Sequence, residues 1–324
     1  MEPSRRVSLV WNGRAGTHTR RAGLAKVIGA ILARPPNPQR VYGPQTLHEL
    51  ELAAQHIHRD RPDILGIAGG DGTVHRTLTA VMRSRDATHD ALPDILIVPV
   101  GTMNNVAAAL GITRMPPVEF TRRIVEKITL GIPLDYVHVR PLMVGDACGF
   151  LYGAAAPVNL LQRYYAKPET VGLRRGIEVI AETLWDELLG LLPFRNPQHL
   201  LTSPVTATFV LPGYGPPIVA SRSYTGLMVG AIDQVGSGCR ALPRALEQPG
   251  RFMVRATRLS FWGLIGNLIR IWTGQPIPQT FDAVVSHAVI EYAAPTVTMI
   301  DGELRPPTTR DVITCGPLLR FIIG

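Results

Sequence analysis

The chain has 324 residues, 46% of them hydrophobic and 18% charged, with a formal net charge of +8. This composition predicts a globular protein with room for two domains, and no apolar run reaches the ~18 residues that a membrane-spanning helix needs. The basic balance suits nucleic acid, anionic lipid or phosphorylated small molecules. Because the chain lacks zinc-finger spacing and the aromatic signature of RNA-binding modules, we expect no nucleic-acid partner.

Cysteine usage and the first residues indicate a cytoplasmic protein. The cysteines Cys148, Cys239 and Cys315 are odd in number and far apart, which is typical of a reducing compartment without a disulfide framework or a clustered metal site. Met1–Arg6 leads into a strand-like run and not into the apolar core of a signal peptide. The sequence does not indicate an oligomeric state.

Strands and helices alternate through the first 131 residues. Apolar runs and helical spacing predict strands at 6–11, 40–42, 64–68 and 94–100, and helices at 20–32, 46–57, 74–82 and 106–110. This alternation predicts a doubly wound, parallel α/β domain over residues 1–131. Ligands of such sheets bind at the carboxyl ends of the strands.

A glycine-rich loop follows the third predicted strand. Gly69-Gly70-Asp71-Gly72-Thr73 separates this strand from a helix. Glycines let the backbone approach a ligand closely, and the N-terminus of a helix presents free N–H groups to an anion. The loop therefore predicts a phosphate site, although a plain turn without a ligand is the alternative. It matches neither the Walker A pattern nor the dinucleotide fingerprint.

A second polar loop, Gly101-Thr102-Met103-Asn104-Asn105, follows the next strand. Both loops come at carboxyl ends of strands, so we expect them to share one ligand.

The pattern changes after residue 131. Alternating runs at 135–139, 205–210, 252–256 and 288–292 predict a mainly antiparallel domain over 132–313, with helices at about 173–192 and 260–272. Residues 314–324 are expected to pack back on the first domain. Near the end, Asp301-Gly302-Glu303 predicts a tight turn, for which a plain exposed hairpin is the alternative.

Three loops in this order resemble the lipid kinase superfamily with a diacylglycerol-kinase-type catalytic domain, which includes bacterial diacylglycerol kinases and sphingosine kinases. The matching segments are 69–73, Gly101-Thr102-x-Asn104 and 301–303. Two weaker matches are Asn12-Gly13-Arg14-Ala15-Gly16 and the glycine-rich segment 236–243.

The resemblance implies ATP-dependent phosphorylation of a lipid hydroxyl with Mg²⁺, at a site between an α/β domain and a β-sandwich-like domain. It implies that Glu303 is the general base, that Asp301 assists it or binds metal, and that Asp71 lies beside the γ-phosphate and Mg²⁺. It also implies a group of nucleotide-binding residues: Asn12, Gly69, Gly70, Gly72, Thr73, Thr102 and Asn104.

Three residues depart from the family pattern. Arg76 and Asn105 replace acids, and Pro249 replaces the aspartate of an Asp-Gly metal site. They leave open a non-catalytic nucleotide- or lipid-binding protein. A soluble-metabolite kinase related to NAD kinase is a further alternative, which the Asp301-Gly302-Glu303 segment disfavours.

A membrane partner is suggested by residues 258–272, which contain Trp262 and Trp272, arginines and no acid. Tryptophan favours the membrane interface and arginine favours anionic headgroups. We expect a lipid substrate and peripheral contact with an anionic membrane. The alternative, slightly favoured by Gly263 and Gly266, is a helix packed in the core.

Overall fold

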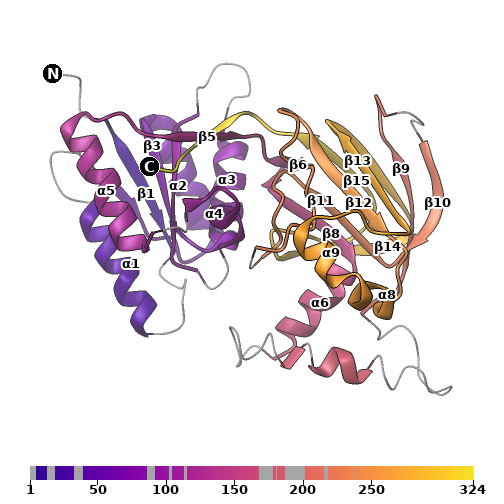
Figure 1. Cartoon of the computed structure of the whole chain (residues 1–324). Coiled ribbons are helices and arrows are strands. Elements are labelled where there is room, and N and C mark those ends of the chain that lie inside the picture. The colour runs from indigo at the N-terminus through magenta and orange to yellow at the C-terminus, as the bar shows by residue number, and fades with distance from the viewer. Residues whose placement is uncertain are drawn as a thin grey trace. The chain divides into compact units, whose positions relative to one another are not determined.

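The computed structural model forms two compact units, which are described separately (Figure 1). The first contains residues 1–149, 236–238 and 316–324, and the second contains 150–235 and 239–315. The residues described are 5–12, 19–32, 39–85, 92–101, 104–112, 115–167, 178–179, 181–186, 201–214, 218–236 and 238–324.

A six-stranded, mostly parallel sheet forms the centre of the first unit, in the order β2-β1-β3-β4-β16-β5. Its strands are β1 (Val7–Trp11), β2 (Gln39–Tyr42), β3 (Ile64–Gly69), β4 (Asp94–Pro99), β5 (Tyr136–Val139) and β16 (Leu319–Ile322). Its helices are α1 (Thr19–Leu32), α2 (Leu47–Asp60), α3 (Asp71–Ser84), α4 (Asn105–Ala109) and α5 (Pro117–Leu130). Helix α1 packs beside α5, and α2 packs beside α3. The predicted α/β domain is confirmed.

Burial and capping explain these elements. All residues of β3 and β4 are buried, as expected for central strands of a parallel sheet. Helix α2 begins after Thr46, whose hydroxyl accepts a hydrogen bond from the backbone N–H of Glu49. This N-cap satisfies one of the unpaired amides at the start of the helix.

The boundary between the units lies later than the sequence pattern indicated. The strand expected at 135–139 in the second domain is β5, and it pairs antiparallel with β16 in the first sheet. The hairpin of β6 (Leu142–Val144) and β7 (Ala147–Gly149) also belongs to the first unit. The alternating pattern of β5 also occurs in strands of the second unit, so periodicity alone did not reveal that β5 pairs with β16.

The second unit contains a mainly antiparallel sheet, as predicted. Strands β13-β12-β11-β8-β14-β15 are neighbours in this order, and β9 joins β10 to β14. The strands are β8 (Leu151–Ala155), β9 (Val205–Val210), β10 (Ile218–Tyr224), β11 (Gly226–Gly230), β12 (Phe252–Thr257), β13 (Thr280–Val285), β14 (His287–Ile300) and β15 (Glu303–Cys315). Three helices of this unit are α6 (Ala156–Tyr165), α8 (Phe261–Gly266) and α9 (Leu268–Thr273).

One predicted helix is divided in two. The helix expected at 260–272 forms α8 and α9, with Asn267 between them at φ −108° and ψ 11°. The side-chain amide of Asn267 donates to the carbonyl of Gly263, and such local bonding competes with a regular helix. The helix expected at 173–192 lies mostly outside the described residues, which include helical turns at 178–179 and 181–186. Within the described part of the chain, no helix is long and apolar enough to cross a membrane.

Candidate nucleotide and acceptor sites

The GGDGT loop joins β3 directly to α3. Gly70 is the N-cap residue of α3, and its carbonyl accepts hydrogen bonds from the backbone N–H groups of Thr73 and Val74. A side chain at Gly69 would come within 2.3 Å of the Thr73 hydroxyl oxygen. The turn therefore requires glycine at this position. The turn leads into the fourteen-residue helix α3, and the backbone N–H groups in the first turn of this helix can face an anion.

The second loop closes on itself through Asn104. The side chain of Asn104 accepts a hydrogen bond from the N–H of Gly101 and donates one to the Gly101 carbonyl, both at 3.1 Å. A Cβ atom at Gly101 would lie 2.3 Å from the Cα atom of Gly70. The two glycine-rich loops therefore pack backbone against backbone, and only glycine allows this approach.

Asp71 connects the two loops electrostatically. Its two carboxylate oxygens accept hydrogen bonds from the backbone N–H groups of Asn105 (2.9 Å) and Val106 (3.1 Å) at the start of α4. Burial raises the pKa of the Asp71 carboxyl above its usual value, although both hydrogen bonds act to lower it. Burial therefore makes ionisation of Asp71 less favourable than in water, and perturbed pKa values of this kind are common at functional sites.

Asn12 lies at the end of the neighbouring strand β1. Its side-chain amide donates to the Thr73 hydroxyl at 3.1 Å. This brings six of the seven predicted nucleotide-binding residues, with Asp71, to one edge of the first sheet. The seventh, Thr102, lies outside the described residues, as do Gly13 to Gly16 of the first predicted loop.

Two of the three residues that depart from the family pattern, Arg76 and Asn105, lie in the first unit. Arg76 is exposed on α3. Asn105 begins α4, and a Cβ atom at Gly236 would lie 3.2 Å from its side-chain oxygen. Gly236 has a φ of +129°, which favours glycine. Gly236 therefore lies beside Asn105 of the second loop, a proximity that its position in the sequence did not reveal.

Asp301 and Glu303 lie at the hairpin that joins β14 to β15 in the second unit. Asp301 and Gly302 have φ angles of +47° and +84°, which are typical of a two-residue hairpin turn. The backbone N–H of Phe150 donates to both carboxylate oxygens of Asp301 at 3.0 Å. The N–H of Leu151 donates to one of these oxygens at 2.8 Å. Asp301 therefore anchors the turn to the start of β8, while the Glu303 side chain is partly exposed.

A buried polar network supports this hairpin. The Tyr152 hydroxyl donates to Asp311 at 2.7 Å and lies 2.6 Å from the Tyr292 hydroxyl. Arg305, two residues after Glu303, donates to the other oxygen of Asp311 at 2.7 Å. Burial raises the pKa of both tyrosines. Sequence reasoning missed this network, because its members lie on three different strands.

The described side chains do not by themselves form a metal site. No group of three or more histidine, cysteine, aspartate or glutamate residues that could hold a metal occurs among them. The oxygens of the two predicted metal ligands, Asp71 and Asp301, already accept backbone hydrogen bonds. Mg²⁺ is often held by one or two carboxylates together with substrate phosphates, so the metal role of these residues stays a prediction.

The segment around Pro249 is a turn without an acid. Gly250 has a φ of +76°, and its carbonyl accepts a hydrogen bond from the Cys315 thiol at 3.0 Å. The residues from 248 to 251 are Gln, Pro, Gly and Arg. Residues 248–251 of this turn therefore supply no carboxylate for a metal.

A parallel sheet with two joined glycine-rich loops and a separate antiparallel unit define the fold class of diacylglycerol-kinase-like proteins. Residues 6–136 match the family model of the diacylglycerol kinase catalytic domain. The resemblance inferred from the loops is thereby confirmed, and the match covers both glycine-rich loops.

Individual proteins of low sequence identity also match the chain. The chain is 27% identical over 188 residues to "Probable lipid kinase YegS-like" of Stenotrophomonas maltophilia (strain K279a). That match covers 58% of this chain and 54% of the relative, so only about half of the relative's length is spanned. A crystal structure of a diacylglycerol kinase from Bacillus anthracis str. Sterne matches 99% of this chain and 97% of its own, with a TM-score of 0.65 at 14% identity. A second structure from this organism, provisionally named a diacylglycerol kinase, has a TM-score of 0.71 at 16% identity. These structures establish the fold.

Proposed function

We propose that this chain is an ATP-dependent kinase that phosphorylates the hydroxyl group of a lipid. The observation that carries the proposal is the joining of the two glycine-rich loops at the carboxyl ends of β3 and β4, inside the segment that matches the diacylglycerol kinase catalytic domain. Loops of this kind hold phosphates with backbone N–H groups. The names of the relatives support a lipid as the acceptor.

In this proposal the first unit binds the nucleotide. The backbone of Gly69 to Thr73, at the start of α3, holds the phosphates, and the Asn12–Thr73 hydrogen bond fixes one border of the loop. Asn104 holds the second loop in the conformation that lets Gly101 approach Gly70. A bound Mg²⁺ would neutralise phosphate charge, with Asp71 as the nearest carboxylate of this loop.

The second unit supplies the base. Glu303 takes the proton of the acceptor hydroxyl as the oxygen forms its bond to the γ-phosphorus and the bond to the ADP oxygen breaks. Asp301 acts as a positioning residue, because its carboxylate fixes the turn that carries Glu303. The Tyr165 hydroxyl, which donates to the Gly302 carbonyl, steadies the same turn.

Phosphate transfer from labelled ATP tests the proposal directly. The protein is incubated with labelled ATP and Mg²⁺, first with a lipid extract and then with NAD. Labelled lipid supports the proposal. Labelled NAD product would instead indicate a soluble-metabolite kinase, and nucleotide binding without any transfer would indicate the non-catalytic protein that Arg76, Asn105 and Pro249 suggest.

The role of Glu303 has a matched control on the same hairpin. Removal of a positioned base typically lowers the rate by ~10²–10⁴-fold, so Glu303→Gln is expected to lose transfer to that extent. Glu291 lies on β14 and pairs with Arg310 at the surface, and Glu291→Gln is expected to keep the wild-type rate. Equal rates for the two variants would contradict the assignment of the base.

A further inference from the structure

The helices α8 and α9 of the second unit carry a group of exposed apolar side chains in one short segment. These five residues, which we call the α8–α9 face, are Trp262, Ile265, Leu268, Ile269 and Trp272. Ile269 is 79% exposed, and the two tryptophans are 46% and 44% exposed. The alternative that the helix is packed in the core, which the sequence slightly favoured, does not agree with this exposure.

The α8–α9 face is held firmly by its polar and buried neighbours. Phe261, the first residue of α8, is buried, and the Ser260 hydroxyl caps this helix by accepting a hydrogen bond from the Gly263 N–H. At the other end, the Trp272 carbonyl accepts from the backbone N–H of Arg240. The exposed side chains are therefore presented by an ordered support and not by a fraying end.

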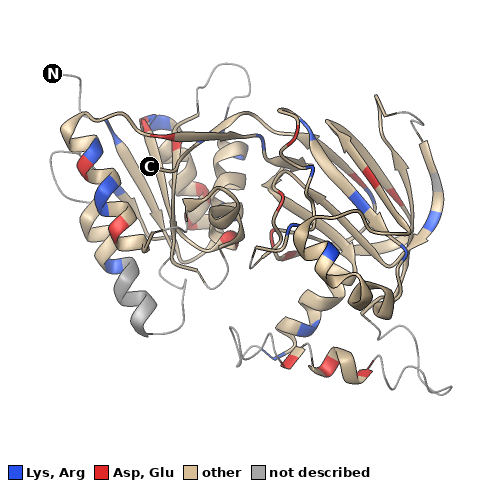
Figure 2. Cartoon of the chain, viewed as in Figure 1, with Lys and Arg blue, Asp and Glu red and all other residues tan. Residues whose placement is uncertain are grey.

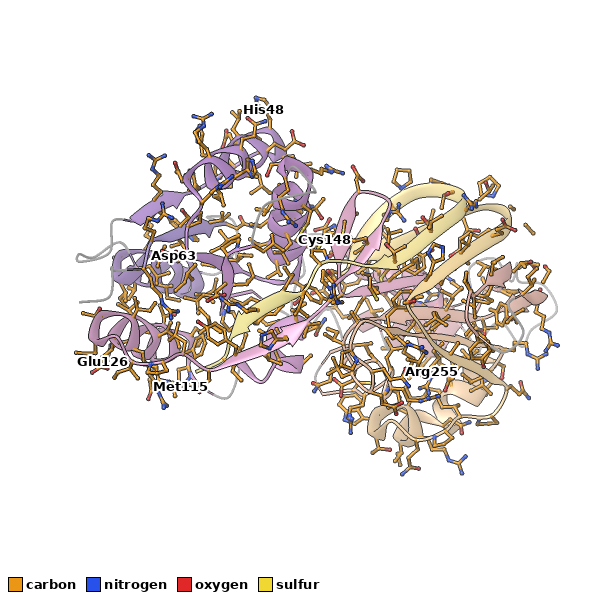
Figure 3. The ribbon with its side chains drawn as sticks, turned by 90° about the horizontal axis from the view of Figure 1, so that it is seen from above. His48, Asp63, Met115, Glu126, Cys148 and Arg255 are labelled. Atoms are coloured by element: carbon orange, nitrogen blue, oxygen red, sulfur yellow. The ribbon has the colours of Figure 1, made fainter. Side chains whose placement is uncertain are left out.

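The charged residues within the segment that carries this face are all basic. No acidic residue occurs from 252 to 281, whereas Arg258 and Arg270 are both exposed. Within the described part of the chain, neither arginine forms an ion pair with a carboxylate. Figure 2 shows no acidic position on α8 or α9. Arg255, labelled in Figure 3, is excluded from this count because it is buried and paired with Asp282.

We propose that the α8–α9 face is a docking surface for an anionic lipid bilayer. An interfacial helix buries apolar side chains at the boundary of headgroups and acyl chains, tryptophan prefers this depth, and arginine binds anionic headgroups. A protein partner with an apolar surface would gain nothing from two exposed arginines in a segment devoid of acids. Anionic headgroups would, because the arginines can bind their negative charges.

Flotation with vesicles tests this surface, and nucleotide is left out so that binding is measured apart from activity. We expect the wild type to float with vesicles of phosphatidylcholine mixed with an equal amount of phosphatidylglycerol, and to remain unbound with phosphatidylcholine alone. Ile269→Ser is expected to weaken partitioning by at least about tenfold, because the variant loses the burial of a large apolar side chain in the bilayer. Ile218→Ser, at a residue that is 61% exposed on β10, is the control and should bind as the wild type does.

The arginines have their own variants. The double variant Arg258→Gln, Arg270→Gln is expected to bind about 25-fold more weakly, since each arginine near an anionic surface contributes about a fivefold factor. Arg222→Gln, at an exposed position of β10, is the control. A wild type that never floats, or variants that all float as it does, would overturn the proposal. So would a sedimentation result in which Ile269→Ser dissociates a dimer without changing flotation, because the face would then join two copies of the chain.

Discussion

Asp71 offers a sharp test of how the two glycine-rich loops are held. Its carboxylate satisfies two backbone N–H groups at the start of α4. Asp71→Ala removes both acceptors, and loss of such a cap costs about 0.5–2 kcal/mol, or up to ~3 kcal/mol where the hydrogen bonds involve a charged group. We therefore expect Asp71→Ala to lower the free energy of unfolding by about 1–3 kcal/mol.

Asp71→Asn is expected to behave differently. The amide keeps one acceptor oxygen, and it removes a charge whose burial raises the pKa of the carboxyl. These effects oppose each other, so the change in unfolding free energy should stay below ~1 kcal/mol. If the proposed function holds, both variants should lose phosphoryl transfer.

The raised pKa also fixes the sign of the pH dependence. The native state holds the Asp71 proton more tightly than the unfolded state, whose pKa is near the usual 3.8. The stability from this group is fully present below that pH and is lost as the pH rises through the raised pKa. Asparagine does not titrate, so the stability of the wild type relative to Asp71→Asn should fall as the pH rises from about 4.

Urea denaturation at several pH values, with hydrogen exchange at the Asn105 and Val106 amides, measures these effects. Exchange should be faster in Asp71→Ala than in Asp71→Asn. Asp146→Asn is the control, because Asp146 is 70% exposed in a surface pair with Arg83 and should contribute less than ~1 kcal/mol. If Asp71→Asn were as unstable as Asp71→Ala at neutral pH, the carboxylate charge would be a structural clamp and our reasoning would be refuted.

Three further variants test other features of the two units. Gly101→Ala should abolish ATP binding in calorimetry, because its Cβ would lie 2.3 Å from the facing loop, whereas Gly43→Ala has no atom within 4 Å and should bind normally. The pKa of Tyr292 is raised in the native state, so above about pH 10 this tyrosine ionises in the unfolded state first and the native state loses stability. Tyr292→Phe should therefore lose less stability than the wild type when both are denatured at alkaline pH. Arg76→Ala should weaken ATP binding several-fold relative to Arg83→Ala on the same helix, because Arg76 lies near the start of α3, where the phosphates are proposed to bind; equal dissociation constants would contradict such a contact.

The sequence alone determined the fold class and the places of the two glycine-rich loops at the edge of the first sheet. Buried strands of a parallel sheet are continuous apolar runs, so β3 and β4 were visible in the sequence, and their boundaries agree within about two residues. The loops after them are defined by glycines, whose need for close backbone approach is a local property. Residues 6–136, which match the family model, contain both loops.

Only the tertiary structure decided what the acids do and which surfaces are buried. The letters Asp71 and Asp301 do not reveal which amides their carboxylates accept, because the donors come from segments that are distant in sequence. The assignment of β5 to the first sheet depended on its pairing with β16, almost two hundred residues away along the chain. Apolar periodicity predicted a helix at 260–272, but not that it bends at Asn267 and leaves its tryptophans exposed. Periodicity reports that a helix has an apolar side, whereas burial depends on whether another element of the fold covers that side.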